Sequence, residues 1–436
     1  MKLRPLLRTG IVAAFCILCT SSKAQFLMDM IDTTKDLGKG MLSMYQKFDH
    51  IRISGYMQPQ YQVASDSGIN SFAGGPFPPN SNNRFTLRRG RIRFDYALFD
   101  KLNHPSLQFV FQFDGSERGV FIRDFWGRVW ENKWQLFSFT TGMFARPFGY
   151  EVNLSSGDRE SPERGRMSQT LMKTERDLGV MASFEPRTGN IFLTHIKVDG
   201  GLFNGQGLTS NFDYDSYKDF IGQAYWKPAK IGANIWVSGG VSVLEGGFIQ
   251  NGKYRYQTVE DGNGGHYVAT DSTHEHGSKL PRKYYGANAQ IKLKHGWGAT
   301  ELRGEYWFGT QTGSHFASET PPSLVYGDNS YMRQFHGAFV YLLQNIVNEN
   351  NQLVFKYDLY DPNTEVEGAE IGKPGGNFTI ADIKYYTYGF GYLHYFNPHL
   401  KIVLYYDLVK NEATQLDNHK TDISDNVFTC RLQFRF

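Results

Sequence analysis

The chain has 436 residues, of which 15% are aromatic and 46 are glycine, yet its mean hydropathy is only −0.45. Four of the 46 Lys and Arg residues and none of the 43 Asp and Glu residues lie in the first 24 positions, so the remainder is close to neutral. This excludes a globally basic surface for nucleic acid. No later stretch is apolar over about 18 residues, which argues against a transmembrane helix. An aromatic-rich and glycine-rich but polar composition is typical of a membrane β-barrel, in which only alternate residues contact lipid.

Residues 1–24 have the pattern of a secretory signal peptide. Three basic residues (Lys2, Arg4 and Arg8) precede a short apolar run, and Ser22 and Ala24 supply the small residues of a cleavage site. The sequence therefore predicts an exported protein.

The three cysteines are distributed unevenly between this signal and the rest of the chain. Cys16 and Cys19 lie in the signal, so only Cys430 remains after cleavage and no internal disulfide is expected. Lipid attachment at Cys16 or Cys19 is the alternative. It is disfavoured because Phe15 and Leu18 stand where such a signal needs a small residue.

Residues 25–50 place apolar side chains at near-helical spacing. The positions are Leu27, Ile31, Leu37, Met41, Tyr45 and Phe48. This spacing predicts a short amphipathic helix. We expect a periplasmic leader that packs on the base of the following domain or pairs with copies of itself; a plug inside a pore is the alternative.

From Ile51 onward the period of the hydrophobic pattern changes to two, which is the period of a half-buried strand. Short turns follow the even strands, and long polar loops follow the odd strands, with one short exception after the third strand. This parity predicts an all-β fold for residues 51–436, a 16-stranded antiparallel transmembrane β-barrel. The expected strands are 51–63, 84–99, 105–114, 119–131, 133–150, 177–186, 190–203, 217–228, 231–245, 282–295, 297–311, 331–344, 350–361, 383–396, 399–411 and 426–436.

The last strand reads NVFTCRLQFRF and carries apolar side chains at its even positions up to Phe436. We expect it to pair with strand 51–63 and close the barrel, because an open sheet edge is not tolerated in lipid. A terminal aromatic residue also resembles the recognition signal of outer-membrane barrels.

The same alternation assigns side chains to lipid or to the lumen. Ile92, Phe94 and Tyr96 predict that Arg89, Arg91 and Arg93 point inward, while Arg88 has the opposite parity and is expected at the outer rim. The inward set holds twelve basic residues (89, 91, 93, 146, 197, 292, 294, 303, 356, 401, 431 and 435) and six acidic residues (95, 199, 301, 305, 358 and 407). A positive lumen predicts a preference for anions. The alternative is that Glu163, Asp158 and Asp95 neutralise the arginines and leave a nearly non-selective hole.

One region resembles a known family, the phosphate-selective porins O and P. The resemblance covers about residues 84–186 and rests on FTLRRGRIRFDY, on FIRDFWGRVW and on TGMFARPFGYEVNLSSGDRESPERGRM followed by TERDLGVMASFEP. It implies a porin of the outer membrane of a Gram-negative bacterium that contacts lipid and lipopolysaccharide and assembles as a homotrimer. It also implies that loop 151–176 folds into the pore as a constriction.

In that family, basic residues of the wall and of the loop form an anion path. The resemblance therefore implies that Arg89, Arg91, Arg93, Arg146, Arg164 and Arg166 line the path of small anions such as phosphate. The loop departs from a purely basic pattern, because it mixes five basic residues with Asp158, Glu160, Glu163 and Glu175.

An enzyme is not expected. No G-x-S-x-G turn and no phosphate-binding glycine loop stands between a strand and a helix, and the pair His274 and His276 is too sparse to predict a metal site. We therefore expect no catalytic residue, no cofactor and no metal. The alternative function is a non-conducting accessory barrel of an outer-membrane assembly or secretion complex.

Overall fold

The computed structural model describes residues 50–189, 192–209, 213–261, 264–320 and 327–436. The predicted signal peptide (1–24) and the predicted helix (25–50), except its last residue, lie outside the described residues.

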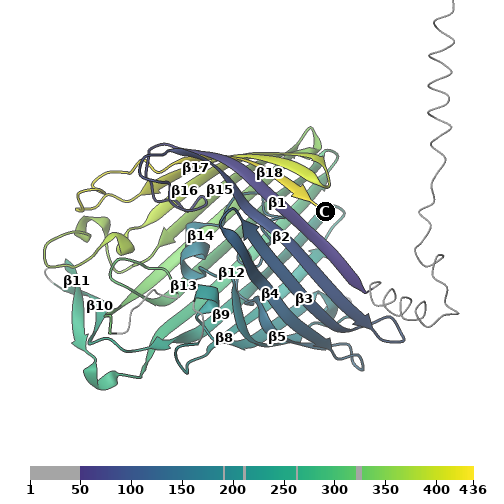
Figure 1. Cartoon of the computed structure of the whole chain (residues 1–436), viewed down its shortest axis with the longest axis horizontal. Coiled ribbons are helices and arrows are strands. Elements are labelled where there is room, and N and C mark those ends of the chain that lie inside the picture. Colours follow the sequence, from purple (N-terminus) through teal and green to yellow (C-terminus); the bar gives the residue numbers. More distant parts are fainter. Residues whose placement is uncertain (1–49, 190–191, 210–212, 262–263, 321–326) are drawn as a thin grey trace, which may run out of the picture. The chain divides into compact units, whose positions relative to one another are not determined.

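Sixteen antiparallel strands form one closed barrel, as the sequence predicts (Figure 1). Each strand pairs with its neighbours in chain order, except that β9 pairs directly with β12. The strands are β1 (Ile51–Ala64), β2 (Asn83–Phe99), β3 (Pro105–Ser116), β4 (Gly119–Trp130), β5 (Phe137–Ala145), β6 (Arg176–Phe184), β7 (Ile196–Phe203), β8 (Asp219–Lys230), β9 (Ile235–Ile249), β12 (Lys279–His295), β13 (Gly298–Gly313), β14 (Ser330–Ile346), β15 (Asn348–Asp361), β16 (Tyr385–Asn397), β17 (Leu400–Asn411) and β18 (Val427–Arg435).

The long segment between β9 and β12 contains a hairpin where the sequence analysis expects only a loop. Strand β10 (Tyr254–Asp261) pairs with β11 (Gly264–Asp271), and three residues of β10 pair in parallel with the start of β14. The hairpin projects from the end of the barrel that carries the long loops, which we call the loop end (Figure 1). We call the opposite end, with the short turns, the turn end. The alternation in YRYQTVED was visible, but the glycines around it favoured the loop interpretation.

The closing strand pairs with the first strand as predicted. Tyr61 lies opposite Cys430 in the β1–β18 register. Beyond the strand end, the backbone groups of Gly55 and Phe436 exchange two hydrogen bonds of 3.0 and 3.1 Å. The chain terminus is therefore fixed by backbone pairing, and the sheet has no free edge there.

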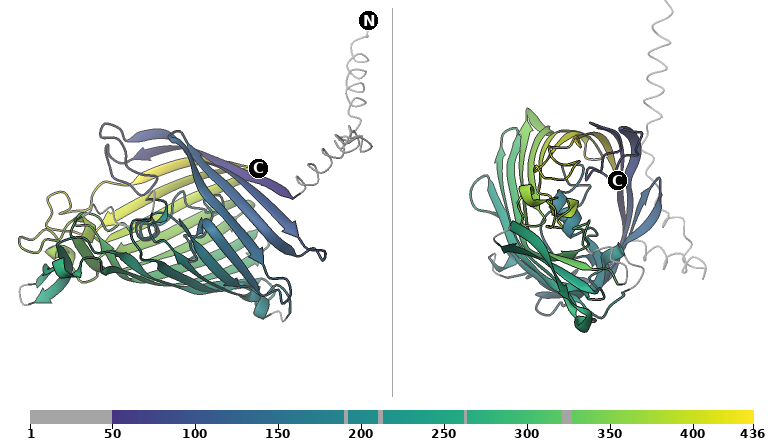
Figure 2. Two further views of the ribbon diagram at one scale, coloured as in Figure 1. Left: turned by 60° about the horizontal axis from the view of Figure 1, so that its bottom comes forward. Right: turned by 90° about the vertical axis from the view of Figure 1, so that its left-hand side faces the viewer.

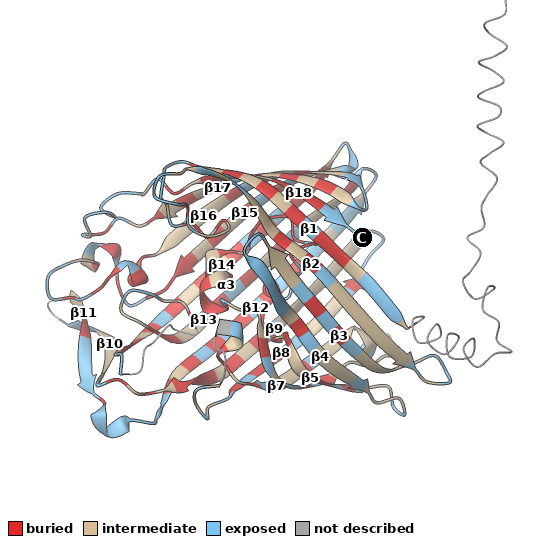
Figure 3. Ribbon diagram, viewed as in Figure 1, coloured by how far each residue is buried: buried red, intermediate tan, exposed pale blue. Residues whose placement is uncertain are grey.

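Exposed and buried residues alternate along the strands, as Figure 3 shows. On β3, for example, Phe109, Phe111 and Phe113 are exposed on the outer face while Val110 and Gln112 are buried. Such a belt of outward apolar side chains matches a barrel that spans a bilayer. None of the helices in the described part of the chain is long and apolar enough to cross a membrane.

One strand ends earlier than predicted and another begins later, and both differences have a local cause. Strand β5 stops at Ala145 because the chain turns into the barrel at Pro147. Strand β7 starts only at Ile196, after a 3₁₀ turn (η2, Leu193–His195).

Candidate functional site

The connection from β5 to β6 lies inside the barrel, and its short helix α3 (Arg166–Leu171) stands within the ring of strands (Figures 2 and 3). Its entrance is fixed by Phe148, which is fully buried and packs edge-to-face on Trp307 with ring centroids 4.8 Å apart. Gly149 follows with φ +71°, where a Cβ atom would lie 2.6 Å from Glu305 Oε1 and 2.7 Å from the Trp307 ring. Only glycine fits this turn without strain.

Glu151 is the most heavily bonded residue of this loop. Its carboxylate, 1% exposed, accepts hydrogen bonds from Lys356 Nζ (2.9 Å), Ser168 Oγ (2.7 Å), Tyr341 OH (3.0 Å) and the Gly165 backbone N–H (2.9 Å). Burial alone would raise the pKa of Glu151. The Lys356 ammonium, the Arg159 guanidinium and these hydrogen-bond donors outweigh burial and lower the pKa of Glu151 to about 2. Glu151 is therefore ionised, and it ties the two ends of the loop to β14 and β15.

Two further glutamates bind arginines of the wall. Glu163 accepts from Arg89 on β2 (2.6 Å), from Arg88 (2.9 Å) and from Arg431 on β18 (2.9 Å). Burial opposes the ionisation of Glu163, but these guanidinium groups hold its pKa well below the usual range. Arg88 therefore points to the loop in the lumen and not to the outer rim, which corrects the prediction from parity.

Glu160 binds the opposite wall. Arg303 on β13 donates two hydrogen bonds to its carboxylate, at 2.8 and 3.1 Å. Together with Glu151 and Glu163, this contact anchors the loop on both sides of the barrel.

Other loops cover the inserted loop from the loop end. Gln169 Nε2 donates to the carbonyl of Phe72 (2.9 Å), and the Thr320 N–H donates to the carbonyl of Thr170 (2.9 Å). Lys173 forms an ion pair with Glu319 at 2.5 Å. The inserted loop is thus bound both by the barrel wall and by the loops at the loop end.

Two cavities beside the loop lie toward the first eight strands. One has a volume of about 390 Å³ and is lined mainly by β4–β8, and the other has about 270 Å³ and is lined mainly by β1–β4. They share Arg93, Asn153, Leu154 and Arg176, so they adjoin each other. We call this pair the lateral lumen.

Basic side chains dominate the lateral lumen. Nine basic residues line it (Arg89, Arg91, Arg93, Arg123, Arg128, Arg159, Arg176, Lys197 and Arg435), against three acidic residues (Asp124, Glu175 and Asp199). Seven of the nine have a carboxylate within 4.0 Å; the partners are Glu163, Asp114, Asp95, Glu175, Asp124, Asp199 and Asp158. Glu175 also binds Arg164, so its single negative charge is shared between two arginines.

Arg128 and Arg159 have no carboxylate at ion-pair distance among the residues that the structure describes. Arg128 Nε donates to Thr140 Oγ1 at 2.8 Å, and its guanidinium carbon lies 5.1 Å from the centroid of the Trp126 ring. Arg159 is 4% exposed; its side chain donates to the Pro162 carbonyl at 3.5 Å, and the Glu151 carboxylate acts on it from beyond ion-pair distance. These two guanidinium groups are therefore the least compensated charges among the described basic residues of the lateral lumen.

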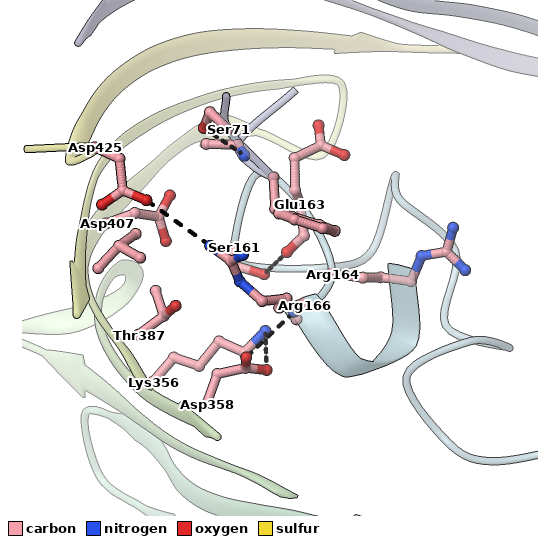
Figure 4. Close-up of a pocket in the computed structure, with 14 residues that line it drawn as sticks. Ser71, Ser161, Glu163, Arg164, Arg166, Lys356, Asp358, Thr387, Asp407 and Asp425 are labelled. Atoms are coloured by element: carbon pink, nitrogen blue, oxygen red, sulfur yellow. Dashed lines mark hydrogen bonds and ion pairs between the residues drawn. The ribbon is translucent and has the colours of Figure 1, made fainter. Parts of the chain in front are cut away.

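The predicted site residues fall into three groups, and the third consists of Arg146 alone. Arg89, Arg91 and Arg93 line the lateral lumen, each paired with a carboxylate. Arg164 and Arg166 line a separate small cavity of about 40 Å³ on the other side of the loop (Figure 4).

In that small cavity, carboxylates outnumber basic groups. Figure 4 shows Glu163, Asp358, Asp407 and Asp425 around it, together with Lys356 and Arg166. Arg166 packs on Tyr385, with its guanidinium carbon 3.5 Å from the ring centroid, and reaches Asp425 at 3.8 Å. Its charge is therefore engaged.

Arg146 is placed differently from the prediction. Its side chain is fully buried and donates to the Thr174 carbonyl, so it does not reach the water of the lumen. Burial lowers the pKa of Arg146. Its position next to Pro147, where the chain leaves the wall, explains the difference, since strand parity no longer applies at the start of the loop.

Sequence reasoning missed Arg123, Arg128, Arg159 and Arg176 as residues of the site. For Arg128 the sequence carries a signal, because the outward positions of Phe125 and Val129 assign the odd positions to lipid and the even position 128 to the lumen. The position of Arg159 depends on the fold of the loop, which has no periodic pattern.

No cluster of three or more potential metal ligands exists among the described residues. Near the predicted histidine pair, Glu275 binds Arg255 at 2.8 Å, and the imidazole of His276 lies 3.2 Å from the Gly252 carbonyl.

No known family model and no curated protein sequence matches the chain. Solved structures match its fold. The outer membrane channel DcaP of Acinetobacter baumannii has a TM-score of 0.53 and 11% identity, over 88% of this chain and 97% of that one. OmpT of Vibrio cholerae, an in-vitro folded outer membrane protein in its trimer form, has a TM-score of 0.47 and 11% identity, over 88% and 99%. A double mutant of Rh. blastica porin has 0.44 and 10%, over 88% and 100%. The chain thus has the fold of outer-membrane channels, while its resemblance to the phosphate-selective family stays a prediction.

Proposed function

We propose that the protein is an outer-membrane porin that passes small hydrophilic solutes through the lateral lumen and prefers anions. The observation that carries the proposal is the pair Arg128 and Arg159. Both line the lateral lumen, and neither has a carboxylate at ion-pair distance among the described residues. In a narrow channel with low-dielectric walls, uncompensated charge attracts counter-ions strongly. Phosphate is one such anion, and no arrangement of donors here singles it out.

The reversal potential across a salt gradient in planar bilayers tests this proposal. We expect an anion-selective sign in the intact protein and a shift toward cations in the double variant Arg128→Gln with Arg159→Gln. Arg118→Gln is the matched control, because the Arg118 side chain is 79% exposed on the loop after β3. A cation-selective intact protein, or a double variant with the reversal potential of the control, would contradict the proposal. The preference should also weaken as salt shortens the Debye length.

A non-conducting accessory barrel is the second candidate, and the covering of the inserted loop by Phe72, Thr320 and Glu319 favours it. The same bilayer recordings decide between the two functions, since an accessory barrel would give no channel currents. A homotrimer in contact with outer-membrane lipid and lipopolysaccharide belongs to the porin proposal. Its mass in detergent, measured by light scattering, tests the trimer.

A further inference from the structure

The larger cavity of the lateral lumen has features that simple passage of ions does not require. Its volume of about 390 Å³ lies in the range of small-molecule sites. Three aromatic side chains line it, Trp126 from β4, Tyr225 from β8 and Tyr150 from the inserted loop. A path for hydrated ions gains nothing from such apolar rings, whereas an organic solute can pack on them.

The groups in direct contact with Arg128 in this cavity are neutral, and the carboxylates of Asp199 and Glu185 act on it only from beyond ion-pair distance. Thr140 Oγ1 accepts from its Nε atom, and the guanidinium carbon lies 5.1 Å from the centroid of Trp126 and 5.7 Å from that of Trp130. Cation–π contacts orient a guanidinium without neutralising it. The terminal nitrogens of Arg128 therefore keep both their charge and their free donors, and a fork of two N–H donors matches a carboxylate.

The remaining charges of this cavity balance each other. Arg176 pairs with Asp124 at 3.1 Å and Lys197 pairs with Asp199 at 3.1 Å, while Arg93 pairs with Asp95 at 2.7 Å. Arg128 is thus the one basic residue among the described residues lining this cavity that has no carboxylate at ion-pair distance. A single excess charge suits a monoanion. The nearby carboxylates of Asp124 and Asp199 would repel a second negative group on the solute.

We propose that this cavity is a binding site for a small aromatic monocarboxylate, with Arg128 on the carboxylate and Trp126 and Tyr150 against the ring. The inference rests on the porin proposal and names the class of solute that its lumen retains during passage. Gln223 and Asn153, which also line the cavity, supply neutral hydrogen-bonding groups at its edge.

Ligand-observed NMR on the detergent-solubilised protein tests the site, with empty micelles as the blank. The probes are benzoate, acetate, benzyl alcohol and inorganic phosphate, so that charge and ring are varied separately. We expect benzoate to bind at least tenfold more tightly than each of the other three. Arg128→Gln should weaken benzoate at least tenfold, and Trp126→Leu should bring benzoate down to the affinity of acetate. Trp126→Phe should retain most of the preference, and Arg118→Gln should behave as the intact protein.

Each result has a definite meaning. Equal affinities for benzoate and acetate in the intact protein, or unchanged benzoate binding in Arg128→Gln, would overturn the inference. The reversal potential is measured independently of these affinities. An anion-selective channel without a benzoate preference would refute this site and leave the porin proposal standing. Benzoate binding without anion selectivity would support the site and contradict the proposed anion preference. If a variant does not fold, the comparison of probes on the intact protein still decides.

Discussion

Removal of the Glu151 charge tests directly how the inserted loop is held in the barrel. Glu151→Gln leaves a side chain of nearly the same size but deprives the buried Lys356 ammonium of its closest anion, 2.9 Å away. Breaking a buried ion pair by neutralising one partner costs about 3–5 kcal/mol. The pKa of about 2 gives a consistent figure, since a shift of that size from the usual 4.5 corresponds to about 3 kcal/mol. The β14 and β15 anchor of the loop should therefore fail before the barrel does.

Single-channel recordings measure this directly. We expect Glu151→Gln to increase open-channel noise and mean conductance, because the loop no longer holds one position in the lumen. Glu349→Gln, at the exposed start of β15, is the matched control. The double variant Glu151→Gln with Lys356→Met removes both charges and should recover much of the loss, because no buried ammonium is left unpaired. Conductance and noise identical to the control in Glu151→Gln would refute the reasoning.

The same carboxylate makes the stability of the inserted loop depend on pH. Its folded pKa of about 2 lies below the ordinary value of 4.5, so the unfolded state binds more protons between these pH values. The stabilisation by Glu151 is complete above about pH 4.5 and is lost as the pH falls toward 2. Channel noise in the intact protein should therefore rise over this acid range, and Glu151→Gln should show a smaller rise.

Two further predictions concern the start of the loop and the end of the chain. Gly149→Ala places a Cβ atom 2.6 Å from Glu305 at a positive φ, and it should lower the stability of the folded protein by about 2–5 kcal/mol, measured by thermal unfolding in detergent; an unchanged midpoint would contradict the packing described for this turn. Deletion of Phe436 removes the two backbone hydrogen bonds to Gly55 and should reduce the heat-modifiable, folded fraction in outer membranes. Normal insertion of that variant would count against the role of the closing strand.

Much of the barrel could be predicted from the sequence, because a strand in lipid leaves a period of two that no other constraint disturbs. Phe109, Phe111 and Phe113 face outward for this reason, and the parity of loop lengths identified the strands in order. The hairpin β10–β11 projects from the loop end of the barrel (Figure 1), and its alternation is too short to distinguish it from a loop.

The charges of the lumen were harder to predict than the strands, for a physical reason. Parity places Arg89 and Arg93 inside, but it does not say which anion each one meets. That depends on the path of the inserted loop, where Glu163 reaches the wall after a chain without periodic pattern. Arg88 shows the limit clearly, because its contact with Glu163 overrides the direction expected from its strand position.

The arginines of this lumen have two different roles. The number of arginines therefore does not by itself predict the ion selectivity. An arginine such as Arg89 or Arg303 binds a loop glutamate, so its charge serves to hold the loop and contributes little to the field that a solute meets. Arg128, held by Thr140 and the Trp126 ring, has no carboxylate at ion-pair distance, so its charge stays available to a solute. Loop anchoring needs paired charge, whereas attraction of a solute needs unpaired charge on a fixed side chain. Selectivity in such a barrel should therefore follow the arginines that neutral groups position, and substitutions of the paired ones should act mainly by moving the loop.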